Sequence, residues 1–258
     1  IIKLGGGLNL AGSVTYKTTR LILLTNASLN NSSSLLLGSL DLNGYALTTL
    51  MGLTINEALT LDASGEQLLT GDSDLTLKGA LVISNGKLTS ASGTITFDST
   101  ASLASPGTML VQGGELHVKG NVSVDGITLS LADASTLKLI NDVNFNSNTA
   151  LIFGSLDMNN KSLTFSGSGS QGIELTIKKA FNLNSGSTLK MSDADLTFTE
   201  AATIVGLLEP SVEKTLKFKK GGSVSGTANI KDSTLALETA NLAFTGTGKL
   251  LTNAGTTI

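Results

Sequence analysis

Two pairs of aspartates recur in the chain with the same spacing. Asp72 and Asp74 stand in the segment DSDLTL, and Asp193 and Asp195 stand in DADLTF. Two carboxylates two residues apart beside a turn could bind Ca²⁺ through their oxygen atoms. The Gly-Gly-x-Gly-x-Asp pattern of calcium-binding nonapeptides is missing, however, and aspartates also cap turns before strands. We therefore predict no metal and no other cofactor, and keep these four aspartates as the metal candidates.

The single histidine is the next candidate for chemistry. His117 alternates with Leu116 and Val118, so we expect it to point outward from a strand as a solvated residue. No Gly-x-Ser-x-Gly elbow sits between a strand and a helix, so serine nucleophile chemistry is unsupported. We predict no catalytic residue and no enzyme activity.

A polysaccharide-active enzyme is the catalytic alternative. Such an enzyme needs carboxylates clustered on one face, and usually aromatic or basic residues along a sugar groove. Aromatic residues are only 4% of this chain, tryptophan is absent, and Arg20 is the only arginine. The composition therefore disfavours this alternative.

Four lysines close together could attract an anion: Lys214, Lys217, Lys219 and Lys220. Two of them, Lys217 and Lys219, share one face of the segment TLKFK, and outward lysines on a strand also discourage unwanted edge pairing. The net charge of −3 creates no field that would recruit nucleic acid. No aromatic residues alternate with the lysines to stack on bases. We predict no nucleic-acid partner.

Strands must position these residues, because helical periodicity is nearly absent. Short runs alternate apolar residues with Thr, Ser or Lys, which is typical of a half-buried strand, and Gly, Asn, Asp and Ser separate the runs. Examples are 59–61 (LTL), 94–97 (TITF), 136–139 (TLKL) and 234–237 (TLAL). Apolar residues form 40% of the 258 residues, enough for a core, and there is no cysteine for disulfides or thiolate metal sites.

The density of these runs predicts an all-β fold, a parallel β-helix or β-solenoid. A coil of three short strands needs ~20–25 residues, so we expect about ten coils. The handedness of parallel crossovers favours a right-handed coil. No linker or shift in composition interrupts the chain, so we predict one continuous domain over residues 1–258.

The chain contains an internal repeat. Residues 20–48 align without gaps with residues 136–164, with eleven of 29 positions identical, and the match includes GSLDLN and GSLDMN. It resumes further on, so that residues 20–77 match residues 136–198. The additional residues of the second copy fall in the loop SGSGSQ (166–171), as stacked repeats require.

Continuous apolar runs break the alternation at matched places in the two copies. If the adjoining apolar residues of each run point inward, four apolar residues point outward: Leu24, Leu36, Ile140 and Ile152. Exposed apolar patches often mark interfaces, so we predict lateral self-association along a stripe of these four residues. A covering loop, or a corner residue that turns inward, is the alternative. Terminal coils without caps also predict end-to-end stacking.

Several glycine-rich segments resemble a known group of proteins: FTGTGKLLTNAGT (244–256), GGELHVKGNVSV (113–124) and the paired GSLDLN and GSLDMN. They are similar to the Gly-x-Leu-x-Leu repeats of bacterial autotransporter passenger domains and of filamentous-haemagglutinin-type adhesins. The resemblance implies a right-handed β-helix displayed at the bacterial surface. Those families also include secreted effectors and filament-like stalks.

We therefore expect a non-catalytic β-solenoid, extracellular or at the cell surface, that serves as a stalk, filament subunit or adhesin passenger. A module that binds glycans or host surfaces is the alternative. An ice-binding surface would need Thr-x-Thr pairs in register on successive coils, whereas Thr94/Thr96 and Thr197/Thr199 are scattered along the chain. No stretch reaches the ~18 consecutive apolar residues of a membrane span.

Overall fold

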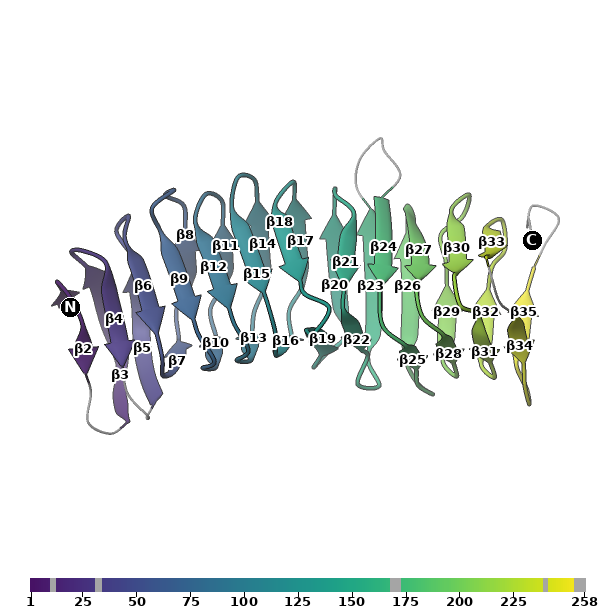
Figure 1. Ribbon diagram of the computed structural model, residues 1–258, viewed down its shortest axis with the longest axis horizontal. Coiled ribbons are helices and arrows are strands. Elements are labelled where there is room, and N and C mark those ends of the chain that lie inside the picture. Colours follow the sequence, from purple (N-terminus) through teal and green to yellow (C-terminus); the bar gives the residue numbers. More distant parts are fainter. Residues whose placement is uncertain (10–12, 31–33, 168–172, 239–240, 253–258) are drawn as a thin grey trace. The chain divides into compact units, whose positions relative to one another are not determined.

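A computed structural model describes residues 1–9, 13–30, 34–167, 173–238 and 241–252. Over these residues the chain forms strands, turns and bends but no helix, and the strands pair in parallel with those of the next coil. The fold is a parallel β-solenoid, as predicted. Contacts divide it into two units, Ile1–Ser135 (unit 1) and Thr136–Ile258 (unit 2). Figure 1 shows the coils of each unit in succession.

Unit 1 has three faces, each a parallel sheet. The first face contains β1 (Ile2–Leu4), β3 (Val14–Leu23), β5 (Ser34–Asp41), β7 (Gly52–Ile55), β10 (Leu75–Leu77), β13 (Ile95–Phe97) and β16 (Glu115–Val118). The second contains β2 (Leu8–Asn9), β4 (Ala27–Asn30), β6 (Ala46–Thr49), β9 (Gln67–Thr70), β12 (Lys87–Ser90), β15 (Thr108–Val111) and β18 (Thr128–Leu131). The third contains β8 (Leu59–Leu61), β11 (Leu81–Ile83), β14 (Ala101–Ala104) and β17 (Val122–Asp125).

Unit 2 repeats this arrangement with its own strands. One pair is β19 (Thr136–Leu139) with β22 (Ser155–Asp157). A second sheet contains β20 (Val143–Ser147), β23 (Ser162–Gly167), β26 (Thr188–Ser192), β29 (Leu207–Glu209), β32 (Thr227–Asn229) and β35 (Lys249–Leu251). A third contains β21 (Leu151–Phe153), β24 (Ile173–Ile177), β27 (Ala194–Phe198), β30 (Thr215–Phe218) and β33 (Thr234–Leu237). A fourth contains β25 (Phe181–Leu183), β28 (Ala202–Ile204), β31 (Gly222–Val224) and β34 (Leu242–Phe244).

The coils are more numerous than the ten predicted, because several fall below the expected ~20–25 residues and most others lie at its short end. Leu21 pairs with Leu40, 19 positions later, and Leu35 pairs with Leu53, 18 positions later. Over the described residues, seven coils in unit 1 and five complete coils in unit 2 give about twelve. Among the described residues, the second and third coils contain two strands and not three, because β3 and β5 stay extended where later coils bend. A register shift between Tyr16 and Arg20 accommodates the extended course of β3.

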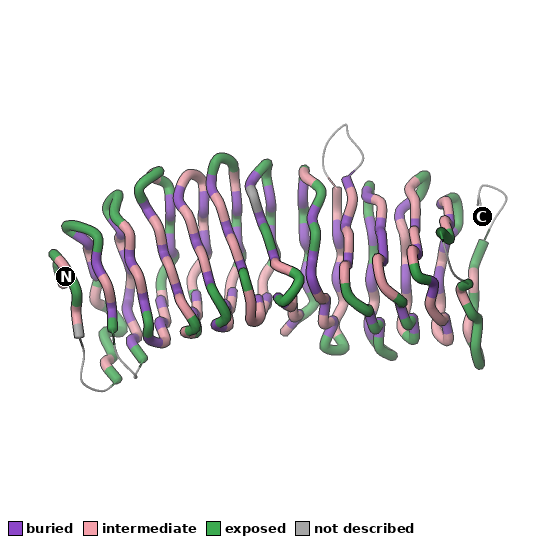
Figure 2. The backbone as a smooth tube through the Cα atoms, viewed as in Figure 1, coloured by how far each residue is buried: buried purple, intermediate pink, exposed green. Residues whose placement is uncertain are grey.

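The core follows from the alternation of side chains. Buried and solvent-facing positions alternate along the strands, as Figure 2 shows. In unit 1, Leu53, Leu75, Ile95 and Leu116 stack in register on four successive coils, and none is more than 1% exposed. Burying one such side chain contributes roughly 1.5–3 kcal/mol. The stacked leucines and isoleucines therefore provide much of the free energy that holds the coils together.

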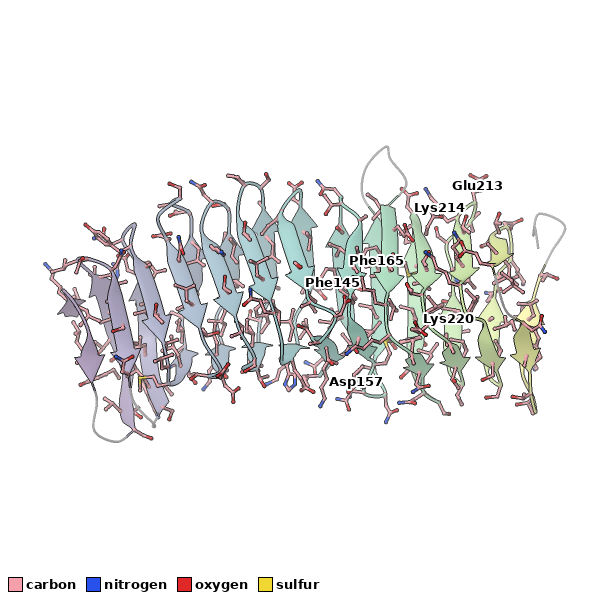
Figure 3. The ribbon with its side chains drawn as sticks, viewed as in Figure 1. Phe145, Asp157, Phe165, Glu213, Lys214 and Lys220 are labelled. Atoms are coloured by element: carbon pink, nitrogen blue, oxygen red, sulfur yellow. The ribbon has the colours of Figure 1, made fainter. Side chains whose placement is uncertain are left out.

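The core of unit 2 is richer in aromatic residues. Phe145 and Phe165 are in register on β20 and β23, with their ring centroids 6.1 Å apart in a stacked arrangement (Figure 3). Phe198 and Phe218 lie in register on β27 and β30, with centroids 5.0 Å apart. Such aromatic pairs contribute about 0.5–1.5 kcal/mol beyond the area that they bury.

The sequence repeat has the same local structure in both copies. Asn43 and Asn159 each adopt a positive φ, of 51° and 46°, in a turn that favours Asn because its side chain tolerates this conformation. The side-chain amide of each donates a 3.0 Å hydrogen bond to a carbonyl of the preceding coil, that of Leu23 or Leu139. Residues 31–33 and 168–171 of the repeat, and 253–256 of the glycine-rich segment, lie outside the described residues.

Candidate functional site

Asp74 and Asp195 each bind a backbone amide of the following coil. Oδ1 of Asp74 accepts a 2.8 Å hydrogen bond from the amide of Thr94, just before β13. Oδ1 of Asp195 accepts a 2.6 Å bond from the amide of Thr215, at the start of β30. The alternative to metal binding, an aspartate that caps a turn before a strand, is thus met by a contact with the following coil.

The same contact recurs at a second pair of matched positions. Oδ1 of Asn26 accepts a 2.9 Å hydrogen bond from the amide of Ala46, and Oδ1 of Asp142 accepts a 2.8 Å bond from the amide of Ser162. Asn and Asp are thus interchangeable here, because either side chain supplies the acceptor oxygen.

Asp72 and Asp193 also contact the next coil. Oδ1 of Asp72 accepts a 2.6 Å hydrogen bond from the hydroxyl of Ser92, and Oδ1 of Asp193 lies 2.8 Å from Nζ of Lys214. Within the part of the chain that the structure describes, no group of three or more His, Asp or Glu side chains is arranged to hold a metal ion. All four aspartates of the calcium hypothesis therefore bind partners one coil away.

Oppositely charged side chains pair between successive coils on the outer surface. Such pairs include Arg20–Asp41 (2.5 Å), Lys119–Asp98 (2.6 Å), Lys214–Asp193 (2.8 Å), Lys217–Glu238 (2.5 Å) and Lys220–Glu200 (2.7 Å). The two partners stand 20 or 21 positions apart, which is one coil. Three of the four lysines that could attract an anion are therefore paired with carboxylates; Figure 3 labels two of them, Lys214 and Lys220.

Two of these pairs, Lys217–Glu238 and Lys214–Asp193, contain a residue whose pKa is shifted toward its charged form. The hydrogen bond with Glu238 raises the pKa of Lys217, and the same bond lowers the pKa of Glu238. The hydrogen bond with Asp193 raises the pKa of Lys214. The shifts of both partners in the Lys217–Glu238 pair thus agree in favouring the ion pair.

The predicted interface residues are exposed or half-buried on the outer surface: Leu24, Leu36, Ile140 and Ile152. Leu24 is 49% exposed and Ile152 is 47% exposed. Leu36 lies in β5 between Thr15 and Thr54 of the adjoining coils, and Ile152 lies beside Thr176. The structure therefore places threonines, not further apolar residues, next to Leu36 and Ile152. Their role in self-association stays a prediction.

Three threonines form one outward file on the first face of unit 1. Thr54, Thr76 and Thr96 lie in register on successive coils. The sequence did not reveal this file, because register between coils is not visible along the chain. Leu36 and His117 bound it at its two ends. Gly, Asp and Thr stand two positions before Thr54, Thr76 and Thr96, so Thr-x-Thr pairs do not recur on successive coils. The ice-binding alternative therefore gains no support.

His117 points outward, as expected. It is half-buried, and its Nε2 contacts the carboxylate of Glu115 on the same strand. The outward neighbour of His117 in the preceding coil is Thr96. Its surroundings therefore suit a hydrogen-bonded surface residue.

An acidic hollow of about 390 Å³ lies in unit 1, with Arg20, Asp41, Glu57, Asp62 and Glu66 in its walls. Glu66 is only 5% exposed, and its carboxylate accepts hydrogen bonds from three backbone amides. Asp41 pairs with Arg20. Glu57 and Asp62 complete the carboxylate cluster that a polysaccharide-active enzyme would need. This cluster was not predicted from the sequence, although the spacing of Asp41 and Asp62, 21 positions or one coil, was a usable signal.

A second hollow, of about 420 Å³, lies in unit 2 where β26, β29 and β32 end. One wall is formed by outward side chains of these strands, Lys190, Glu209 and Asn229. The other wall is formed by the turns that follow them, with residues Ser192, Pro210, Val212, Lys231 and Asp232. No motif in the sequence marked this hollow, because its residues come from three separate coils.

The turns beside this hollow share an unusual conformation. Asp193, Glu213 and Asp232 adopt φ values of 53°, 58° and 54°, in the left-handed region that residues other than Gly seldom occupy, although Asn and Asp do so more often than most. Figure 3 shows Glu213 at this corner, before β30. Each such residue costs of order 1 kcal/mol or more, which the surrounding structure must offset.

The fold and these sites define a parallel β-solenoid with polar contacts between its coils. Comparison with protein-family models, with curated proteins and with solved structures finds no match to the chain. The described residues include no helix long and apolar enough to cross a membrane.

Proposed function

We propose that the chain is a non-catalytic structural and adhesive β-solenoid displayed outside the cell, as a surface stalk, filament subunit or adhesin passenger. One observation supports this most: charged and polar side chains on the outer faces bind the neighbouring coil, through ion pairs and through side-chain caps of backbone amides. The resemblance of the glycine-rich segments to autotransporter passengers and haemagglutinin-type adhesins supports the same role.

The physical basis is the one-dimensional character of a solenoid. Each coil contacts only its neighbours, so stability grows with every coil added and every contact between coils resists bending. Ion pairs and caps along the outer faces of each unit add to the stacked apolar core. A chain built in this way suits a stiff spacer that holds a binding surface away from its support.

Labelling of intact source cells tests this proposal. Antibodies raised against the purified chain should stain unpermeabilised cells, and protease added outside the cells should remove the signal. Deletion of the coding sequence should reduce attachment to surfaces or to partner cells. Staining that requires permeabilisation would refute the extracellular role.

A glycan- or host-surface-binding module is the second candidate, favoured by the polar hollow of unit 2. Binding of purified protein to a glycan array would separate this role from that of a spacer alone.

The acidic hollow of unit 1 is where the enzyme alternative can be tested. Turnover of an acidic polysaccharide that Glu57→Gln and Asp62→Asn abolish would overturn the non-catalytic proposal.

A further inference from the structure

The chain contains two Asn-Gly dipeptides, Asn43-Gly44 and Asn85-Gly86, and both lie in corners of unit 1. An asparagine followed by glycine can react with its own backbone. The amide nitrogen of the glycine attacks the side-chain carbonyl carbon, and the approach is open because glycine has no Cβ. The sequence alone makes the two dipeptides equivalent. The structure distinguishes them, because it shows what each reacting group is bound to.

At Asn43-Gly44, neighbouring coils hold both reacting groups. Nδ2 of Asn43 donates a 3.0 Å hydrogen bond to the carbonyl of Leu23 in the preceding coil, and the amide of Gly44 donates a 3.3 Å bond to Oε1 of the buried Glu66 in the following coil. The φ of 51° also keeps the backbone of Asn43 in the left-handed region. Attack would first have to break both hydrogen bonds, so the fold protects this dipeptide.

At Asn85-Gly86, the reacting groups are held less firmly. Asn85 is half-buried at the corner between β11 and β12, and its side-chain amide has no hydrogen-bond partner among the described residues. The amide of Gly86 donates to the carbonyl of Leu61 at 3.1 Å, but the amides of Ser84 and Asn85 donate to the same oxygen, at 3.0 and 3.3 Å. A carbonyl oxygen has two lone pairs, so three donors that share it are each bound weakly.

We propose that Asn85 is a site of spontaneous modification, which converts to aspartate and isoaspartate faster than Asn43 does. The amide nitrogen of Gly86 forms a bond with Cγ of Asn85, its proton passes to the departing Nδ2 group, and ammonia leaves. Water then opens the resulting cyclic imide at either of its two carbonyls. One opening gives aspartate, and the other gives isoaspartate, whose backbone is longer by one methylene group. The reaction consumes water and no other reactant.

The corner at Gly86 is too closely packed for a longer backbone. A Cβ atom added to Gly86 would lie 2.7 Å from Cβ of Leu61 and 3.0 Å from the carbonyl oxygen of Glu66. An isoaspartate at position 85 lengthens the link between β11 and β12, so these neighbours have to move. The modified protein therefore unfolds at a lower denaturant concentration, and the stability of unit 1 falls with the age of the molecule. This inference does not depend on where the protein acts.

Incubation of the 258-residue protein in mildly alkaline buffer over several weeks, followed by peptide mapping with mass spectrometry, tests the proposal. The Asn85 peptide should gain the mass change of deamidation about tenfold faster than the Asn43 peptide, because attack at Asn43 must first break two hydrogen bonds. An isoaspartate methyltransferase assay should detect the isoaspartate product. The urea midpoint of wild type should fall during the incubation.

Two controls separate the effect of the fold from that of the dipeptide. In guanidinium chloride, where the chain is unfolded, Asn43 and Asn85 should react at similar rates. Asn85→Gln should form no isoaspartate at this corner and should keep its urea midpoint during the incubation, because glutamine cannot close the five-membered ring. The inference is wrong if the folded protein reacts at Asn43 as fast as at Asn85, or if Asn85 stays intact in the folded protein while it reacts in the unfolded chain.

Discussion

At the level of single residues, the aspartates that bridge successive coils make a testable contribution to stability. Asp74→Ala removes the acceptor for the amide of Thr94 and should lower the free energy of unfolding by about 0.5–1.5 kcal/mol. Asp74→Asn should retain most of that energy, because Asn26 makes the same contact with its amide oxygen. Urea unfolding of the three proteins gives the comparison. A calcium-dependent rise in the wild-type midpoint that Asp74→Asn abolishes would instead identify a metal site.

The Lys217–Glu238 pair predicts how stability depends on pH. The pKa of Glu238 is lowered in the folded state, so its contribution is present above the ordinary Glu pKa of about 4.3 and is lost as pH falls through the lower, folded-state pKa. The pKa of Lys217 is raised, so its contribution is present below about 10.4 and is lost as pH rises through the higher, folded-state pKa.

Thermal unfolding measured from pH 2 to 12 checks this, with Glu238→Gln as the comparison. The variant should unfold at a lower temperature than wild type near pH 7, and the difference should disappear at both extremes. The difference in unfolding temperature between wild type and variant should also be small, and it should shrink in high salt, because the Lys217–Glu238 pair is solvent-exposed. An unchanged difference at pH 2 would show that the pair is not its cause.

At the level of strands and turns, close stacking of coils depends on glycines at the corners. A Cβ atom added to Gly79 would lie 2.2 Å from the carbonyl carbon of Glu57 in the preceding coil. Gly79→Ala should therefore destabilise the protein by about 1–3 kcal/mol, because backbone has to move. Gly5→Ala is the control, since nothing lies within 4 Å of its added Cβ. Denaturant unfolding of both variants measures the difference, and equal stability of the two would contradict the close approach.

The sequence predicted strands better than it predicted their stacking. Alternation identified Leu59–Leu61, Thr136–Leu139 and Thr234–Leu237 at the bounds that the structure has, because a period of two depends only on near neighbours in the chain. Coil length depends on how each corner closes, which is why the extended β5 and the two-stranded coils were missed. Register between coils decides which side chains meet, so neither hollow could be recognised from residues such as Lys190 and Glu209 alone.

At the level of the whole molecule, the outward apolar residues predict self-association. Leu36→Lys with Ile152→Lys should abolish lateral association without unfolding the protein, because outward strand positions tolerate lysine and a charge in an apolar contact opposes it. Val205→Lys, at a 41% exposed apolar residue outside the predicted stripe, is the control. Sedimentation velocity at several protein concentrations measures the outcome. Association that persists in the double variant would exclude the stripe.

The two units also predict how the whole chain unfolds. Unit 2 buries six phenylalanines and unit 1 buries one, Phe97. We therefore expect the contacts between coils to be stronger in unit 2 than in unit 1. Since solenoid stability is approximately a sum over coils and their neighbour contacts, we expect unit 1 to lose structure at the lower denaturant concentration. Both tyrosines, Tyr16 and Tyr45, belong to unit 1 and the chain has no tryptophan. Tyrosine fluorescence should therefore report an earlier transition than far-UV ellipticity, which reports all the strands. Coincident transitions would instead show that all 258 residues unfold as one cooperative domain, as the uninterrupted sequence pattern predicts.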